Sequence, residues 1–305
     1  FSKAHRGFSV PWIGCEVASE PNHITATIQE KRIQELMELT DKYRGENVIS
    51  EKNLRSYTGK CQSFTSVLFS WRPFLNELWA ALTSTKTDHQ SKAPSNCIWL
   101  KQIPHTLAWI KAFIDKTVGS IVRRYSIASY LAPYGNHKLI TDACPWGIGG
   151  IYSVDHRIIG WFAIKILRFE YELFRMVEGD ASSQQTAEAL AILIGLRLFK
   201  DQWANHRTSL EVRSDNLTAL TMMISMKASG YGVNLIAREL ALDLTDGCYK
   251  PQIGSHIPGK SNIVANSLSR KFQPNHKFSL PDCLSNVTEF VTPPRNMDYY
   301  KSLHP

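Results

Sequence analysis

The chain has 305 residues, of which 43% are hydrophobic and 20% charged, a composition typical of a globular protein that can bury a sizeable core. Its formal net charge of +8 favours a polyanionic partner such as nucleic acid, although excess Lys and Arg also occurs on ordinary solvated surfaces. The sequence contains no long apolar run and no signal peptide, which argues against a membrane or secreted protein and for an intracellular one, in the cytoplasm or nucleus.

Residues 1–130 are predicted to form a mostly helical region. The first 23 residues suggest extended, irregular chain, whereas apolar residues recur at helical spacing in three later stretches, 24–44, 50–82 and 99–122. Ser50 is a suitable N-cap for the second stretch, and Pro73 should kink or end it. The polar residues 83–96 predict a linker or exposed loop.

From residue 137 the pattern changes to alternating strands and helices. Strands are predicted at 137–144, 147–154, 157–166, 209–216 and 250–259, and helices at 182–203, 217–226, 233–247 and 261–270. This order predicts an α/β fold with a sheet of mixed strand directions covered by helices. The Pro-, Asn- and Ser-rich residues 272–305 are expected to form an irregular C-terminal tail that wraps the surface or is poorly ordered.

Three carboxylates stand where chemistry is plausible: Asp142 in the first of these strands, Glu188 on the long helix, and Asp215 at the end of the fourth strand. Each has an ordinary explanation as well, since Asp142 could cap a turn, Glu188 could lie on a helix surface, and Asp215 could be an N-cap. Apolar strand residues flank Asp142 and Asp215, so these two acids are expected at the central part of the sheet's edge. A carboxylate that is desolvated there needs a partner. Oxygen-only ligands favour Mg²⁺ or Mn²⁺, and two such ions about 4 Å apart suit phosphodiester hydrolysis.

Four blocks in this order, "ITDACPWGIGGIYS", "SSQQTAEALAIL", "LEVRSDNLTAL" and "HIPGKSNIVANSLSR", resemble the ribonuclease H domain of retroelement reverse transcriptases, and the last block is most similar to Gypsy-like and DIRS-type elements. The resemblance covers residues 137–271 and places a ribonuclease H-like domain at 131–271. It implies a five-stranded mixed sheet flanked by helices, with the third strand antiparallel to its neighbours.

The resemblance also implies a role for each acid. Asp142 matches the acid that bridges two metal ions, Glu188 the helix acid on one metal, and Asp215 the acid near the scissile phosphate. The family's fourth acid falls on Asn266, so the amide departs from the pattern. An amide oxygen can still be a ligand but brings no charge, and a unit charge 4 Å away is worth about 4 kcal/mol at an effective dielectric of 20. Full activity is therefore doubtful, whereas residual activity is expected.

The upstream blocks "WIGCEV", "SEKNLRSYTGKCQS" and "WRPFLNELWAAL" resemble more weakly the primer-grip hairpin, thumb and connection of these polymerases. No Tyr-x-Asp-Asp motif occurs, so we expect no polymerase activity and an upstream palm and fingers that are absent from this chain. A first residue that is Phe rather than Met likewise suggests a fragment or processed product. The six scattered cysteines form no zinc-ligand pattern and fit a reduced compartment.

An RNA–DNA hybrid over the acids would need cationic and polar neighbours. The candidates beside the four blocks are Gln184, Gln185, Arg213, Asn216, Lys260, Ser261, Arg270 and Lys271. His256 is a candidate for assisting proton transfer or product release, although a structural role is the commoner one for such a histidine.

Three alternatives stay open. Asn262 or Asn266 could simply cap the last helix, in which case the fourth position carries no meaning. The protein could be a catalytically impaired nucleic-acid-binding or structural module that has kept the ribonuclease H fold. It could also be a related nuclease that acts on DNA.

Overall fold

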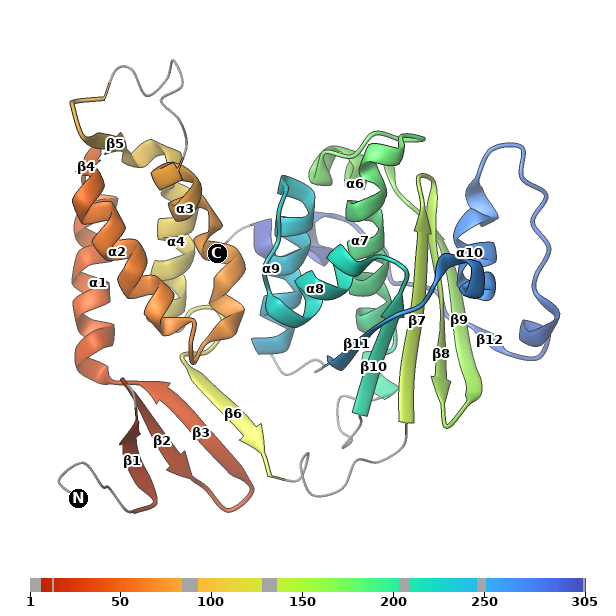
Figure 1. The fold of residues 1–305 in the computed structure, drawn as a ribbon, viewed down its shortest axis with the longest axis horizontal. Helices are drawn as coiled ribbons and strands as arrows, with labels where there is room; N and C mark the ends of the chain where they lie inside the picture. The colour runs from red at the N-terminus through yellow and green to blue at the C-terminus, as the bar shows by residue number, and fades with distance from the viewer. Residues whose placement is uncertain are drawn as a thin grey trace. The chain divides into compact units, whose positions relative to one another are not determined.

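The computed structural model describes residues 7–12, 14–83, 93–127, 136–202, 209–245, 251–303 and 305. The chain divides into two compact units, Phe1–Ala128 together with His304–Pro305, and Ser129–Leu303 (Figure 1). No helix in the described part of the chain combines the length and the apolar character that a membrane crossing requires.

The first unit contains a four-stranded antiparallel sheet that sequence analysis did not predict. Its strands, in spatial order, are β1 (Ser9–Trp12), β2 (Cys15–Ser19), β3 (His23–Ile28) and β6 (Val122–Ser126). The helix expected from residue 24 therefore begins only at Glu30. The β-branched residues of "HITATI" explain this error, because they suit a pleated strand better than a helix.

Four helices of the first unit follow the predicted pattern with shifted ends: α1 (Glu30–Arg44), α2 (Glu51–Phe64), α3 (Asn76–Thr83) and α4 (Pro104–Ile114). The Ser50 hydroxyl accepts the Asn53 N–H at 3.2 Å, which confirms the predicted N-cap. Pro73 lies in a 3₁₀ turn, Phe69–Leu75, between α2 and α3, and the short strands β4 (Val48–Ser50) and β5 (Cys97–Trp99) pair with each other. Buried aromatic rings fill the core between the helices, and Trp71 stacks on Phe113 there.

The second unit is built on a six-stranded mixed sheet in the order β11-β10-β7-β8-β9-β12. The strands are β7 (Asn136–Cys144), β8 (Gly147–Val154), β9 (Arg157–Lys165), β10 (Ser209–Ser214), β11 (Pro251–His256) and β12 (Thr288–Glu289). Strands β7, β10 and β11 run parallel, β8 is antiparallel to both β7 and β9, and β12 is parallel to β9. The predicted mixed α/β sheet flanked by helices is confirmed. The strand antiparallel to both neighbours is the second of the domain, not the third.

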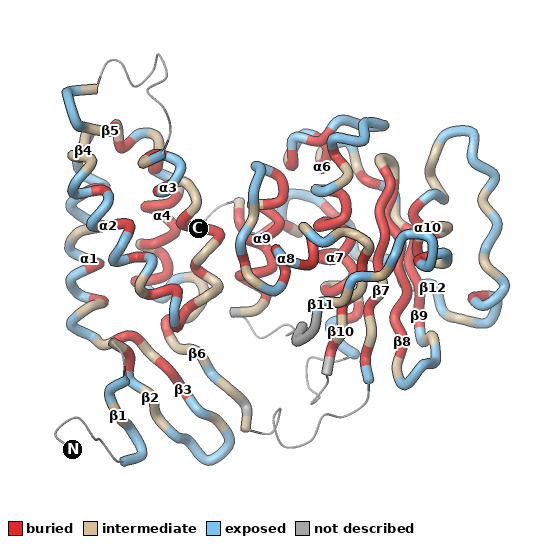
Figure 2. Tube along the Cα trace, in the orientation of Figure 1, coloured by how far each residue is buried: buried red, intermediate tan, exposed pale blue. Residues whose placement is uncertain are grey.

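Helices cover both faces of this sheet. On one face α7 (Gln184–Leu198) packs so closely that a Cβ on Gly195 would lie 3.1 Å from the Leu139 side chain. On the other face lies α10 (Ile263–Ser269), and the remaining helices are α6 (Arg168–Phe174), α8 (Leu217–Ser225) and α9 (Tyr231–Thr245). Every residue of α7 from Ala187 to Leu196 is buried, and Figure 2 shows the burial continuing through β7 and β8.

The residues after 271 contribute to the fold of the second unit. They provide β12, which is the sixth strand of the sheet, and short 3₁₀ turns at Asp282–Leu284, Met297–Tyr299 and Lys301–Leu303. Leu284, Tyr300 and Ser302 are buried. The tail therefore shares in the core of the unit, because its apolar and charged groups find partners there that local sequence does not reveal.

Candidate metal centre

Three carboxylates from distant parts of the chain meet at one end of the second sheet. Asp142 lies in β7, Glu188 on α7 and Asp215 directly after β10, and each offers an oxygen within 4.8 Å of the others. Asp142 and Glu188 are buried, at 5% and 1% exposure, and Asp215 is partly buried. The expected convergence of these acids is confirmed.

The ordinary explanations for the individual acids do not hold. Asp142 is paired with Gly149 in the β7–β8 ladder and caps no turn. Glu188 belongs to the buried part of α7 and not to its surface. The N-cap of α8 is Asn216, whose Oδ1 accepts the Ala219 N–H at 2.9 Å, so Asp215 has no capping role.

Asp142 is held by two side chains of the last helix and its lead-in. The Ser269 hydroxyl donates to Asp142 Oδ2 at 2.6 Å, and Asn262 Nδ2 donates to the Thr141 carbonyl at 3.0 Å while lying 3.5 Å from Asp142 Oδ1. Burial raises the pKa of Asp142 to about 6, with the nearby Asp215 charge adding to the rise. The Ser269 hydrogen bond and the Arg270 charge oppose it.

Glu188 is fixed by backbone and side-chain donors. Its Oε1 accepts the Ala143 N–H at 3.1 Å and Gln184 Nε2 at 2.9 Å, and its Oε2 accepts the Ser214 hydroxyl at 3.3 Å. Burial raises the pKa of Glu188 well above its ordinary value, and the negative charges of Asp142 and Asp215 raise it further. The mutual repulsion means that a bound cation would stabilise the ionised form of all three groups.

Two glycines permit the close packing that assembles the cluster. A Cβ on Gly149, the β8 partner of Asp142, would lie 2.5 Å from both Leu268 Cβ and the Ser269 nitrogen. A Cβ on Gly259, in the turn after β11, would lie 2.8 Å from Asp215 Oδ2. These contacts explain why Gly149 of "GIGG" and Gly259 of the Pro-Gly turn are glycines. A side chain at Gly149 would displace α10, and one at Gly259 would displace Asp215.

Asn266, the predicted fourth position, lies on α10 and is held within its own helix. Its Oδ1 accepts Arg270 Nε at 2.8 Å, one turn further on. The sequence of α10 contains no carboxylate, so the acidic cluster has three members among the described residues. Neither asparagine acts as a side-chain cap: Asn262 precedes the helix but its amide binds β7, and Asn266 lies inside the helix.

The donor set suits a hard divalent cation. The three acids supply oxygen ligands only, and among the described residues none of them takes part in a salt bridge with Lys, Arg or His. Buried carboxylates normally pair with a basic group or coordinate a metal. Oxygen ligands at this spacing fit Mg²⁺ or Mn²⁺ better than Zn²⁺.

The predicted nucleic-acid contacts fall into two groups. Exposed side chains are Gln185, His256, Lys260, Ser261 and Arg270. The others have partners within the unit: Gln184 binds Glu188 and the Ala143 carbonyl, Arg213 pairs with Glu211, Asn216 caps α8, and Lys271 pairs with Glu289 beside the Trp161 ring.

Sequence reasoning did not assign the roles of Ser269 and Ser214, and it considered Asn262 only as a helix cap. Their signal was the phrase "NIVANSLSR", in which Asn262 and Ser269 are seven residues apart and therefore on one helix face. Ser214 directly precedes Asp215, and its hydroxyl also accepts the Asn216 N–H at 3.0 Å.

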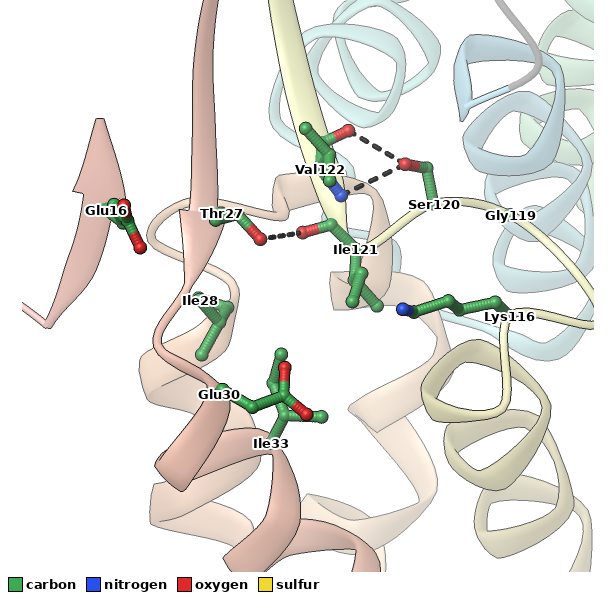
Figure 3. A pocket seen from close by; sticks show the side chains of 10 residues that line it. All are labelled: Glu16, Thr27, Ile28, Glu30, Ile33, Lys116, Gly119, Ser120, Ile121 and Val122. Atoms are coloured by element: carbon green, nitrogen blue, oxygen red, sulfur yellow. Dashed lines mark hydrogen bonds between the residues drawn. The ribbon is translucent and has the colours of Figure 1, made fainter. Parts of the chain in front are cut away.

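A separate pocket of about 350 Å³ lies in the first unit, between β2, β3 and α1 (Figure 3). Its charged lining residues, Glu16, Glu30 and Lys116, carry both signs. The Thr27 hydroxyl donates to the Ile121 carbonyl at 3.2 Å and so belongs to the wall of the pocket. This pocket differs in chemistry from the acid cluster.

Comparison with known proteins yields structural likeness only. No protein-family model and no curated protein matches the sequence. Among solved structures, ribonuclease H1 from the halophilic archaeon Halobacterium salinarum NRC-1 is 16% identical with a TM-score of 0.33, over 44% of this chain and 94% of that one. The foamy viral protease-reverse transcriptase in complex with double-stranded DNA is 12% identical with a TM-score of 0.29, over 82% of this chain and 38% of that one. Both TM-scores lie below 0.5, so the fold class stands on the structure itself, whose strand order and directions show a mixed α/β sheet flanked by helices.

Proposed function

We propose that the second unit is a ribonuclease H-type endonuclease that hydrolyses the RNA strand of RNA–DNA hybrids with two divalent metal ions, Mg²⁺ or Mn²⁺. The observation that carries this proposal is the meeting of Asp142, Glu188 and Asp215 at the sheet end, with no salt bridge to a basic side chain among the described residues. Structural ion-pair networks contain their own cations, whereas this cluster needs one from outside.

The three carboxylates would hold the metal ions, which when bound activate a water and stabilise the charge that develops on the phosphate. The chain's own contribution is to fix the ligands. Gln184 and the Ala143 N–H orient one oxygen of Glu188, and Ser214 orients the other. Burial of Asp142 and Glu188 keeps competing water from their oxygens and strengthens the attraction to a cation.

The substrate would reach the cluster along the exposed polar rim. Lys260 and Ser261 lie in the 3₁₀ turn Gly259–Ser261, directly after the contact between Gly259 and Asp215, and Gln185 is the exposed neighbour of Gln184. These groups can contact phosphates, which both strands carry, and 2′-hydroxyls, by which proteins distinguish RNA from DNA. His256 is exposed at the end of β11, opposite Ser214, where it can assist proton transfer or product release.

We further propose that the chain is the thumb, connection and ribonuclease H portion of a retroelement reverse transcriptase, with the thumb and connection at 1–130, the ribonuclease H domain at 131–271 and a tail at 272–305. The sequence blocks of the resemblance support this assignment. Asn266 weakens the site because it brings no charge. The alternative is a catalytically impaired nucleic-acid-binding module, which the Arg270-bound amide favours.

A hybrid-cleavage assay separates these functions. The full chain is incubated with labelled RNA–DNA hybrid and Mg²⁺ or Mn²⁺, beside Asp142→Asn and Asn266→Asp. We expect low activity for the parent, none for Asp142→Asn and a gain for Asn266→Asp. If the parent and Asn266→Asp are both inert yet bind the hybrid tightly, the binding module is the correct function. Cleavage of duplex DNA under the same conditions would instead indicate a DNA nuclease.

A further inference from the structure

Ser269 links the last helix, α10, to strand β7. It is fully buried, at 0% exposure, and lies at the C-terminal end of α10. Its carbonyl accepts the Cys144 thiol at 3.1 Å, and its hydroxyl lies 2.6 Å from Asp142 Oδ2. Its backbone also packs against β8, since Cβ atoms on Gly147 and Gly149 would lie 2.7 and 2.5 Å from its oxygen and nitrogen.

The Ser269 hydroxyl has a choice of acceptors. One hydroxyl proton can serve either Asp142 Oδ2, at 2.6 Å, or the Asn266 carbonyl one turn back, at 3.0 Å. A hydrogen bond to an ionised carboxylate is shorter and stronger than one to a neutral carbonyl. The shorter contact is to Asp142, so the hydroxyl donates to the carboxylate and not to its own helix.

Asn262 supports Asp142 from the same side. It lies seven residues before Ser269, which places both side chains on the helix face that meets β7. Its Nδ2 donates to the Thr141 carbonyl at 3.0 Å and approaches Asp142 Oδ1 at 3.5 Å. Each oxygen of Asp142 thus has a neighbouring donor from the α10 segment, and the carboxylate is confined to one orientation.

We propose that Ser269 is a positioning residue for the metal centre, which, with Asn262, locks the Asp142 carboxylate in the orientation that binds a divalent cation. The proposal rests on the proposed function, since it assumes that Asp142 is a ligand. Ser269 does not touch the cation; it acts through Asp142. Gln184 has the corresponding role for Glu188, because its Nε2 donates to Glu188 Oε1 and orients that carboxylate. Outer partners of metal ligands typically change metal affinity by 10- to 100-fold when removed.

The test measures Mn²⁺ binding by the full chain, using isothermal titration calorimetry in the absence of nucleic acid. The variants are Ser269→Ala, Ser269→Thr and Asp142→Asn, with Ser267→Ala as the control from the same helix. We expect Ser269→Ala to weaken Mn²⁺ binding about 10-fold or more. Ser269→Thr keeps the hydroxyl and is expected to restore most of the affinity, and Ser267→Ala to match the parent.

Two readouts keep the outcomes distinct. If Asp142→Asn binds Mn²⁺ as tightly as the parent, the proposed metal centre is wrong. If Asp142→Asn loses binding while Ser269→Ala retains the parent affinity, the proposed function stands and the role of Ser269 is overturned. A double-mutant cycle compares the melting temperatures of the metal-free parent, Asp142→Asn, Ser269→Ala and the variant with both substitutions. The two effects on the melting temperature should be non-additive, because the Ser269 hydroxyl acts on the Asp142 carboxylate. Additive effects would also overturn the proposal.

Discussion

The second unit contains two buried acidic clusters that solve the same physical problem differently. The metal-centre cluster consists of Asp142, Glu188 and Asp215, and the second cluster of Glu170, Glu239 and Asp243. In the second cluster the cations come from the chain: Arg197 binds Glu239 and Asp243 at 2.6 Å each, Arg295 binds Glu170 at 3.0 Å, and Lys301 binds Asp243 at 3.0 Å. Among the described residues the first cluster has no such ion pair.

The difference teaches what each cluster is for. The second cluster joins α6, α7 and α9 to the C-terminal tail, since Glu239 also accepts the backbone N–H groups of Lys301 and Ser302 at 2.9 and 2.6 Å. Its charges are satisfied inside the protein, so it is structural. In the metal-centre cluster, burial raises the pKa of both Asp142 and Glu188, which means that the ionised site strains the metal-free protein. Buried acids whose pKa values are raised and that form no salt bridge indicate a function outside folding.

The largest expected effect comes from a matched pair of substitutions, Glu188→Gln and Glu239→Gln. Glu188→Gln should reduce hybrid cleavage about 1,000-fold or more, because it removes a ligand charge, without lowering the melting temperature of the metal-free protein. Glu239→Gln should leave cleavage within about threefold of the parent but lower the melting temperature, because Arg197 loses a buried partner. Cleavage rates and thermal unfolding check both. If the two variants changed the cleavage rate and the melting temperature equally, the proposed difference between the clusters would be wrong.

Removing Arg197, one of the cations of the second cluster, should have the next largest effect. Arg197→Met leaves Glu239 and Asp243 buried with less compensation, and we expect a loss of about 3–5 kcal/mol in the free energy of unfolding. Arg168→Met is the control, because its pair with Glu172 is exposed and should contribute less than about 1 kcal/mol. Chemical denaturation of the metal-free chain measures both. A loss at Arg197 no greater than that at Arg168 would contradict a structural role.

The pH dependence of stability should distinguish the metal centre as well. The folded pKa of Asp142, about 6, lies above the unfolded value of about 3.9, so its protonated form favours folding. This contribution is complete below about pH 4 and is lost as the pH rises through 6, amounting to roughly 3 kcal/mol at most. Asp142→Asn should therefore gain stability relative to the metal-free parent between pH 4 and 8, as followed by melting temperature. Saturating Mg²⁺ should stabilise the parent at pH 8 and reduce the difference. A pH-independent difference would show that Asp142 is not strained.

The sequence could predict the acids but not what holds them. Asp142 and Asp215 are recognisable because apolar strand residues flank them, and Glu188 because it follows "SSQQ" at the start of an apolar helix. The support of Asp142 by Ser269 depends on how α10 lies over Gly149 of β8, more than a hundred residues away in the chain. The position of α10 over β8 is set by tertiary packing, and local sequence propensity does not predict it.

The same reasoning explains the error at β3 and the packing of the residues after 271. Helical spacing around Ile24–Ile28 was misleading because β3 has neighbours on both sides, β2 and β6, which only the folded sheet supplies. The residues after 271 suggested an irregular tail because their composition is polar. Their anchor is the pair of Arg295 with Glu170, 125 residues apart, reinforced by the Tyr300 hydroxyl on the same carboxylate. Long-range charge pairs of this kind cannot be seen in composition.

The smallest expected effect belongs to Asn266→Asp. A new carboxylate about 4 Å from a dication would be worth about 8 kcal/mol before compensation at an effective dielectric of 20, because each of the two positive charges contributes about 4 kcal/mol. Arg270 would take up part of this gain, because its Nε already donates to the side chain at 266 and would form an ion pair with the introduced acid. We therefore expect Mn²⁺ affinity to rise only about tenfold.

The double variant Asn266→Asp/Arg270→Gln separates the two contributions. It frees the introduced carboxylate and removes a positive charge that lowers the pKa of Asp142, so Mn²⁺ affinity measured by calorimetry should exceed that of Asn266→Asp alone. Arg270→Gln in the parent background is the control for the general effect of removing the cation. If Asn266→Asp changes Mn²⁺ affinity in neither background, position 266 lies outside the reach of the metal centre, and the three carboxylates of β7, α7 and the β10 end account for the site without a fourth.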